Sequence, residues 1–512
     1  MQHSPLANAS PVLSHSDVRY IVIGLMLAIL LGAMEQTIVS VSLPMMSADL
    51  QGVDLLAWVV SAYLITVAVA TPIYGKLGDL YGRRFMLSSA IGIFLLGSVL
   101  CALATSMPML VGSRIVQGIG GGGLISLAQT IIADVVSPRE RGRYQGYISG
   151  AFAVASVSGP VLGGLLTQYL SWRWIFWINL PLGLATLIIS RRALMRLPAR
   201  PLIKRPIDYL GAILLTIGLT TLLIGITRVG YGAAWTDVHN VKLFSIAMGA
   251  MLAFVWQERR AVEPIIPLSL FNNATVTISC AITFIAFIQI ISLSVLVPLR
   301  LQMLTDLGAD GAALQLLPMS LGIPCGSFVA GKLTTRTGRY KQLLQTGSVI
   351  VPLVVFALAL SDPQAMVINS FCMAMAGLAI GLQLPTSLVA VQNSADYRHL
   401  GVATAVIAFV RSLGAAVGIA ILMALLLATL QSYAPESMTS LTGGQIINAL
   451  VGDRLADIDA IIRSQLLMSV EDAFQYVFSA SAAIAAISIV LSVLLADGVL
   501  SDYACGPASK NP

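Results

Sequence analysis

The stretch LGAMEQTIVSVSLP, Leu31–Pro44, places one carboxylate, Glu35, about halfway along the first long apolar segment of the chain. If this segment crosses a lipid bilayer, a carboxylate at that depth costs about 2.5–3.5 kcal/mol on insertion scales, which points to a function. Two simpler interpretations stay open. In the first, Glu35 lies near the outer lipid headgroups. In the second, a fixed ion pair neutralises it.

The composition indicates a helical membrane protein. Of the 512 residues, 57% are hydrophobic and only 10% are charged, and the mean hydropathy is +0.88, whereas soluble domains carry roughly 25% charge. The net charge of +6 is spread over short gaps between apolar runs, which favours membrane orientation over nucleic-acid binding. Four of the five cysteines lie in apolar runs, so we expect no disulfide, no metal site and no cofactor.

Apolar runs of about 20 residues predict fourteen transmembrane helices. Residues 1–17 lack the basic start and cleavage site of a signal peptide, so we expect the first run to be retained. The expected fold is an all-α membrane protein with two six-helix bundles and two accessory helices between them. The predicted spans lie near residues 20–45, 56–75, 85–105, 108–135, 144–168, 173–194, 208–229, 240–257, 274–300, 311–334, 342–360, 364–391, 400–430 and 473–496.

The predicted organisation has five parts: a cytoplasmic tail (1–19), an N-terminal six-helix bundle (20–195), a connector with two accessory helices (196–262), a C-terminal six-helix bundle (263–500) and a cytoplasmic tail (501–512). Most of the 29 Lys and Arg residues fall in gaps on the side of the termini. The positive-inside rule therefore places both termini in the cytoplasm and the chain in the inner, cytoplasmic membrane. The acidic outer loop 431–472 carries an amphipathic pattern that suits either a periplasmic adaptor or a simple cover.

A charged motif, GKLGDLYGRR at Gly75–Arg84, follows the second span. Its glycines allow a tight turn, and its charged residues place both charge signs at helix ends. We expect these charges to lock one packing of the bundles and to release it in another. The echo GKLTTRTGR, Gly331–Arg339, indicates an internal repeat, which is an architecture of transporters. The predicted conformational lock consists of Gly75, Asp79, Gly82, Arg83, Arg84 and Arg141.

These motifs resemble those of the major facilitator superfamily, and more closely those of its fourteen-span drug:proton antiporter subfamily of multidrug exporters. The other similar segments are LVGSRIVQGIGGG (Leu110–Gly122), SGPVLGG (Ser158–Gly164), WRWIFWINLPLG (Trp172–Gly183) and PIDYLG (Pro206–Gly211). The resemblance implies that Arg114 takes part in proton coupling. That family usually has Asp where this chain has Glu35 and Asn where it has Ser40, which leaves the acidic chemistry intact.

Glu35 and Arg114 are expected at similar depths. Arg114 lies roughly 10 Å below the outer end of its span, and Glu35 lies roughly 15 Å below the outer end of the first span. Gln117 follows Arg114 by three residues and shares its helix face. A conformational change that alters the hydration of Glu35, or its distance from Arg114, would load or release a proton. The alternative is a static salt bridge.

Two further sets of residues are candidates for function. Gly159, Pro160, Gly163 and Gly164 predict a hinge or gate seal in the fifth span, although a plain helix contact also explains the glycines. Arg411 faces either substrate or headgroups, and each polar amide could equally bond a neighbouring helix. The candidate cavity residues are Gln289, Gln383, Gln392, Asn393 and Arg411.

The expected function is a proton-coupled antiporter that exports small amphipathic drugs or toxic compounds by alternating access, acting as a monomer. Because Glu35 is the one acidic residue placed well inside a span, we expect neutral or monovalent cargo. The alternative is an exporter of a specific metabolite, lipid or siderophore. A channel or membrane sensor is the rival from another class, but the sequence has no filter pattern. It also has no histidine within a span and no nucleotide-binding loop, which argues against an enzyme or an ATP-driven pump.

Overall fold

The computed structural model describes residues 15–50, 55–195, 208–230, 233–305, 307, 309–396, 399–433, 460–498 and 500. The connector 196–207, the loop segment 434–459 and most of both tails therefore lie outside the described residues, so the expectations for them stay predictions. The described residues form α-helices and one short 3-10 helix.

The first half of the chain forms seven helices. Their bounds are α1 (His15–Leu50), α2 (Leu56–Tyr81), α3 (Arg83–Ala102), α4 (Met107–Val135), α5 (Pro138–Tyr169), α6 (Trp174–Trp177) and α7 (Asn179–Leu194). Ser106 and Ser137 begin α4 and α5 as N-caps, because each side chain accepts a hydrogen bond from a backbone N–H of the first turn. The expected sixth span, near residues 173–194, consists of two consecutive helices, α6 and α7.

The remainder of the chain begins with a helical pair. These two helices are α8 (Tyr209–Gly230) and α9 (Val238–Glu258), and η2 (Leu268–Asn272) follows them. The later helices are α10 (Ala274–Leu304), α11 (Ala309–Leu314), α12 (Leu317–Thr337), α13 (Lys341–Leu360), α14 (Met366–Ser394), α15 (Leu400–Tyr433) and α17 (Ala460–Leu494). The last helix begins 13 residues before the expected span, and Leu466, from the expected amphipathic segment, is buried in the core.

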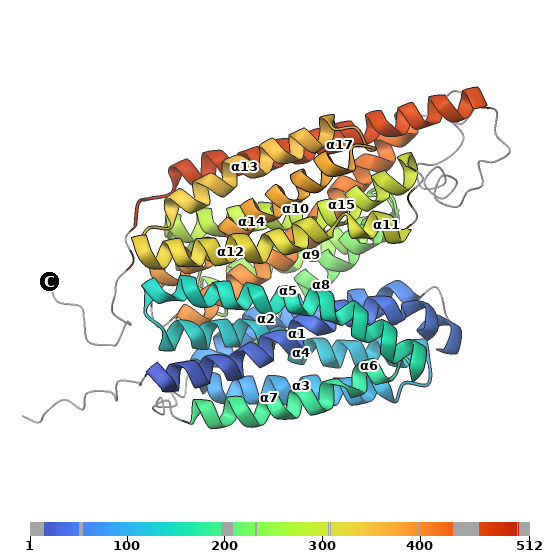
Figure 1. The fold of residues 1–512 in the computed structure, drawn as a ribbon. Coiled ribbons are helices and arrows are strands. Elements are labelled where there is room, and N and C mark those ends of the chain that lie inside the picture. The colour runs from blue at the N-terminus through green and yellow to red at the C-terminus, as the bar shows by residue number, and fades with distance from the viewer. Residues whose placement is uncertain are drawn as a thin grey trace, which may run out of the picture.

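Buried apolar clusters gather the helices into two bundles (Figure 1). One cluster combines residues of α1, α2, α3, α4, α5 and α7, with Phe94 and Leu124 fully buried. The other combines residues of α10, α11, α12, α13, α14, α15 and α17, with Leu293 and Phe474 fully buried. Each bundle thus has its own core, which allows one bundle to move against the other.

The helical pair α8 and α9 lies beside the seam between the bundles. A third apolar cluster joins Leu219 of α8 to Ile65 of α2 and to Val406 of α15. Helix α9 packs against α8. The pair therefore lies outside the two cores and touches both.

The bundles are closest at the end where α1 begins and α17 finishes (Figure 1). We call it the basic end, because Arg83 and Arg141 lie there. Helices α5 and α12 lie side by side at this end and diverge toward the opposite end (Figure 1). A Cβ atom at Gly331 would lie 2.2 Å from the carbonyl oxygen of Gly142, so a larger residue there would force the two helices apart.

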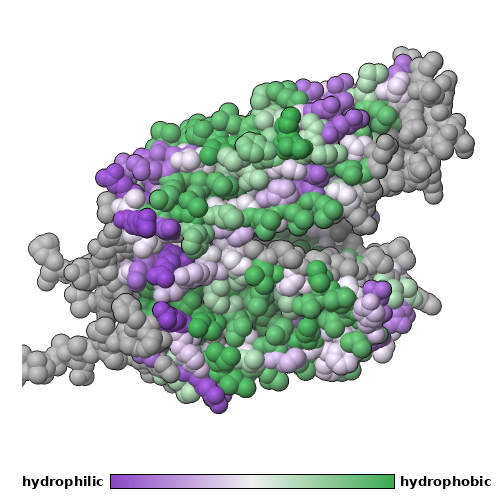
Figure 2. Space-filling model, viewed as in Figure 1, coloured by the Kyte–Doolittle hydropathy of each residue, from purple (hydrophilic) through white to green (hydrophobic). Residues whose placement is uncertain are grey.

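Twelve of the described helical segments are long and apolar enough to cross a membrane. Apolar side chains cover much of the visible side of the bundles, and polar ones gather near the basic end (Figure 2). The expected count of fourteen is not confirmed, because α5 and α12 are absent from the twelve. Both are long enough, with 32 and 21 residues, but glycine, hydroxyl and charged residues lower their hydropathy. The count of fourteen stays a prediction.

Candidate functional site

Glu35 is fully buried inside the first bundle and pairs with Arg114. Helix α1 supplies the carboxylate and α4 the guanidinium, and Nη1 of Arg114 donates to Oε1 of Glu35. The same nitrogen lies 2.6 Å from Oε1 of Gln117, and Nε of Arg114 donates to the carbonyl oxygen of Val59 at 3.0 Å. The structure thus brings together the three residues expected to couple protons, and it buries Glu35 within the protein.

Two further polar residues complete this cluster. The amide of Asn179, at the start of α7, donates to Oε2 of Glu35 at 2.7 Å and to Oγ of Ser98 at 2.8 Å. Ser98, on α3, also accepts a hydrogen bond of 2.9 Å from Gln117. Sequence analysis missed both residues as site members. Asn179 lies in the segment WINLPLG, where an amide among apolar and aromatic residues is a signal that could have found it.

Aromatic and apolar groups surround the cluster and exclude solvent from it. The Arg114 guanidinium lies 4.2 Å from the centroid of the Tyr63 ring, and Tyr63 is 1% exposed. In such surroundings a lone charge is costly, so each ionised partner depends on the other. A carboxylate held in this way can exchange a proton only after a rearrangement admits water.

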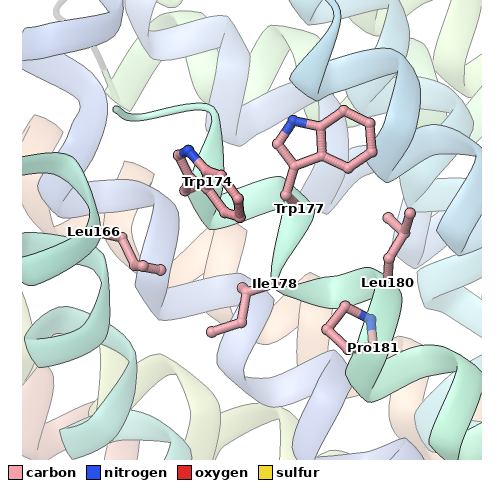
Figure 3. A pocket seen from close by; sticks show the side chains of 6 residues that line it. All are labelled: Leu166, Trp174, Trp177, Ile178, Leu180 and Pro181. Carbon is pink, nitrogen blue, oxygen red and sulfur yellow. The ribbon is translucent and has the colours of Figure 1, made fainter. Parts of the chain in front are cut away.

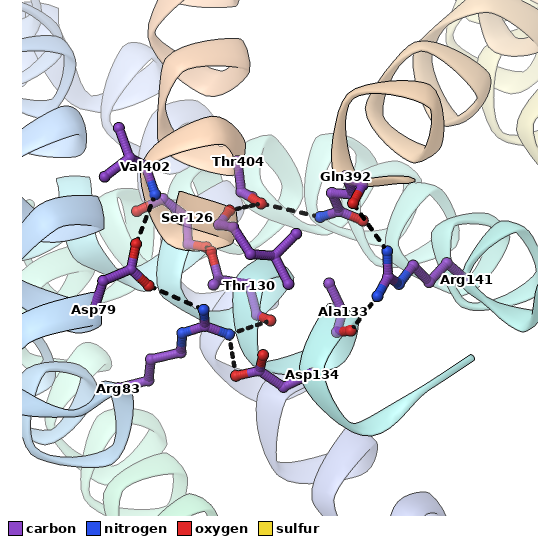
Figure 4. A network of polar contacts seen from close by, with 11 residues as sticks. Asp79, Arg83, Ser126, Thr130, Ala133, Asp134, Arg141, Gln392, Val402 and Thr404 are labelled. Carbon is purple, nitrogen blue, oxygen red and sulfur yellow. Dashed lines mark hydrogen bonds and ion pairs between the residues drawn. The ribbon is translucent and has the colours of Figure 1, made fainter. Parts of the chain in front are cut away.

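The charged motif forms a network at the basic end (Figure 4). Asp79 accepts a hydrogen bond of 3.1 Å from the backbone N–H of Val402, near the start of α15 in the other bundle. Arg83 pairs with Asp79 at 2.9 Å and also with Asp134 of α4. A carboxylate is stabilised at a helix N-terminus, so this contact favours the arrangement in which the bundles touch.

The other motif residues lie nearby but differ in their contacts. Gly75 packs against α15, because its Cβ would lie 2.4 Å from Cβ of Ala405, and Gly82 adopts a φ of 90° that favours glycine. Arg141 donates to the carbonyl oxygens of Ala133 and, at 3.3 Å, of Gln392 in the second bundle. Arg84 is exposed.

An ion pair that sequence analysis missed also joins the bundles. Lys76 of α2 lies 2.8 Å from Glu263, which stands between α9 and η2. Their side chains are 6% and 9% exposed, so the pair is almost removed from water. The segment entering the second bundle is thereby attached to α2.

The glycines of the fifth predicted span pack against α1. A Cβ at Gly159 would lie 2.0 Å from Oγ1 of Thr37, and one at Gly163 would lie 2.6 Å from the carbonyl oxygen of Ile38. Gly164 is partly buried, and α5 continues as a helix through Pro160. These contacts hold α5 close to α1, one turn beyond Glu35.

Three of the four amides expected in a cavity form hydrogen bonds to neighbouring helices. Gln289 bonds to Ser481, Gln383 bonds to Ser348, and both glutamines are buried. Gln392 donates to Thr404, and Asn393 is partly buried. In this structure the three glutamines therefore match the other expectation, that each amide bonds to a neighbouring helix.

A pocket of about 450 Å³ lies between α5 and the α6–α7 break (Figure 3). Its lining is apolar and comprises Leu166, Trp174, Trp177, Ile178, Leu180 and Pro181. None of these residues belongs to the polar cluster. Among the described residues, no group of three or more His, Cys, Asp and Glu could hold a metal ion.

The fold and the buried ionic clusters together define a membrane transporter built from two helical bundles. A sequence model described as the Major Facilitator Superfamily matches residues 25–419, so the chain belongs to that family. It is 33% identical over 494 residues to an uncharacterized MFS-type transporter of Mycobacterium tuberculosis, covering 96% of this chain and 71% of that protein. It is also 34% identical to the multidrug transporter protein MdtP of Bacillus subtilis, covering 79% of this chain and 75% of that protein.

A solved structure supports the fold. The crystal structure of the human organic anion transporter MFSD10 has a TM-score of 0.62 to this chain at 15% identity, covering 93% of this chain and 99% of the other. At that identity the likeness concerns the fold alone. The chain is thus a transporter of the Major Facilitator Superfamily and a multi-pass membrane protein.

Proposed function

We propose that this transporter is a proton-coupled antiporter that exports small amphipathic compounds, neutral or monovalent, by alternating access. We include α5 and α12 as membrane spans, which gives the fourteen-span architecture of drug:proton antiporters. Both termini then lie in the cytoplasm, the membrane is the inner one, and the protein acts as a monomer. The name of another relative, the efflux pump FUS6 of Gibberella moniliformis, supports the direction of transport.

The buried pair of Glu35 and Arg114 carries the proposal. Glu35 is 0% exposed, and two side chains hold its charge, Arg114 of α4 and Asn179 of α7. When these helices shift and water enters, the carboxylate takes a proton, and Arg114 remains with Gln117. One proton entering the cell contributes about 1.4 kcal/mol per pH unit and about 2.3 kcal/mol per 100 mV.

The network at the basic end is the element that we propose controls the conformational change of alternating access. In this structure Asp79 touches α15 and Lys76 touches the segment before η2, while α5 and α12 diverge at the opposite end. We assign this arrangement to the outward-facing state. Release of these contacts would open the cytoplasmic side, and the glycine contacts of α5 with α1 would act as a hinge within the first bundle.

The test is transport of ethidium by everted membrane vesicles under an imposed pH gradient, in which efflux from the cell corresponds to accumulation in the vesicle lumen. Glu35→Gln should abolish the gradient-driven component, since the neutral amide cannot carry a proton. The matched control is Glu471→Gln, which neutralises an exposed carboxylate of α17. Gradient-driven efflux that survives in Glu35→Gln at the wild-type rate would disprove the assignment of the proton site.

A further inference from the structure

Arg411, a cationic residue well inside α15, has no role in the proposed mechanism. It stands eleven residues beyond the start of α15 at Leu400, about 16 Å along the helix, in a helix of 34 residues. Its side chain is partly buried. An ionisable residue within a membrane span is by default a candidate for a function.

The other buried arginines all have oxygen acceptors. Arg83 has Asp79 and Asp134, Arg114 has Glu35, and Arg300 donates to the carbonyl oxygens of Leu358 and Ser361. Arg411, by contrast, has neither a hydrogen bond nor an ion pair within 4.0 Å among the residues that the structure describes. Its contact is the ring of Phe287 on α10, with 4.9 Å from the guanidinium carbon to the ring centroid.

The neighbours of α15 show where Arg411 points. Gly401 and Ala405 face α2 of the first bundle, because Asp79 and Gly75 approach them. Gly414 and Gly418 face α10, at Phe284 and Ile288. At 100° per residue, Arg411 lies between these two directions, on the same side as Thr404, which bonds to Gln392 of α14. The guanidinium is therefore directed toward the interior between the bundles and not toward lipid.

We propose that Arg411 and Phe287 form a subsite for the anionic group of an aromatic cargo, a carboxylate or a sulfonate. The subsite deepens the proposed export function and rests on it. A planar guanidinium matches such a group through paired hydrogen bonds, and its Phe287 contact holds it in one orientation. No described carboxylate competes for it, because the carboxylate of Glu35 is occupied by Arg114 and Asn179.

A matched set of three ligands tests the subsite. Radiolabelled 1-naphthoate, 1-naphthamide and 1-naphthylmethylammonium share one ring system and differ in charge. Binding is measured by scintillation proximity on the full chain in phosphatidylcholine nanodiscs. We expect wild type to bind the anion about tenfold or more tightly than the amide, because a charge-assisted hydrogen bond exceeds a neutral one.

Variants at Arg411 separate the charge from the fold. Arg411→Gln should reduce naphthoate binding to the level of the amide, and an unchanged thermal unfolding transition should show that the variant is folded. Arg411→Lys should keep part of the preference. Equal binding of anion and amide by wild type, or an undiminished preference in Arg411→Gln, would overturn the subsite. Loss of naphthoate binding when phosphatidylglycerol is added would overturn it too, since the occupant would then be a lipid headgroup.

Transport distinguishes this inference from the proposed function. In proteoliposomes, exchange of one proton for one anion moves two charges, so accumulation should respond to voltage by about 50-fold per 100 mV for each charge. Glu35→Gln should lose the pH-driven flux but keep the binding preference. Arg411→Gln should lose the preference for naphthoate in transport as in binding. Loss of the pH-driven flux in Glu35→Gln together with an undiminished anion preference in Arg411→Gln would uphold the proton site and overturn the subsite; the opposite pair of results would uphold the subsite and overturn the proton site.

Discussion

The side-chain amide of Asn179 lies 2.7 Å from Oε2 of Glu35, although 144 positions separate the two residues in the chain. Asn179 stands at the first position of α7, directly after the break that separates α7 from α6. The break therefore determines where a hydrogen-bond donor meets the carboxylate. A movement of α7 would change the environment of Glu35 without any movement of α4.

Replacement of Asn179 by Leu should shift the pH dependence of transport. The ionised form of Glu35 loses a charge-assisted hydrogen bond of about 1.5–3 kcal/mol, so the half-maximal rate should move to higher pH by about one to two units. Dye flux is measured in proteoliposomes between pH 5 and 9. A merely structural residue would lower the rate at every pH and leave the midpoint unchanged. Asn179→Gln, which keeps the amide, should shift the midpoint less.

Neutralisation of Asp79 should weaken the contact between the bundles. Asp79→Asn keeps the size of the side chain but removes the charge that faces the start of α15, a loss of about 1 kcal/mol. Spin labels at the exposed positions Arg84 and Lys332, in a background without the five native cysteines, should report a larger population of long distances. An unchanged distance distribution would mean that the charge does not hold the bundles together.

The pair of Lys76 and Glu263 should behave as a buried ion pair. Lys76→Met or Glu263→Gln alone leaves a charge in surroundings that are almost dry, so each should destabilise the protein by about 3–5 kcal/mol. The double variant Lys76→Met/Glu263→Gln should recover much of the loss. Thermal unfolding in detergent gives the comparison. Additive losses in the double variant would contradict a direct interaction.

A methyl group at Gly163 should disturb the contact between α1 and α5. The added Cβ would lie 2.6 Å from the carbonyl oxygen of Ile38, and overpacking of this kind costs about 1–3 kcal/mol. Gly150→Ala is the control in the same helix, because no atom lies within 4 Å of a Cβ there. Melting temperature and transport should both fall for Gly163→Ala alone. Equal effects of the two substitutions would point to a helix-wide cause and not to this contact.

Much of the proton site follows from sequence because depth is a local property. Each apolar run fixes how far along a helix its polar residue lies, and similar depths on the first and fourth spans led to the pairing of Glu35 with Arg114. The structure places them in contact. The glutamines illustrate the limit of this reasoning. Gln289 and Gln383 have the correct depth for a cavity, but helix rotation turns them toward Ser481 and Ser348.

The sequence by itself determined that the chain is an all-helical membrane protein with a buried acid, a basic partner and a repeated loop motif. These features depend on hydropathy and residue spacing, which are properties of the linear sequence. Only the tertiary structure decided which distant side chains meet. The contacts of Asn179 with Glu35, of Lys76 with Glu263 and of Asp79 with α15 depend on how helices rotate and pack. It also left Arg411 without an acidic partner among the described residues, since packing turned it toward Phe287 and the space between the bundles.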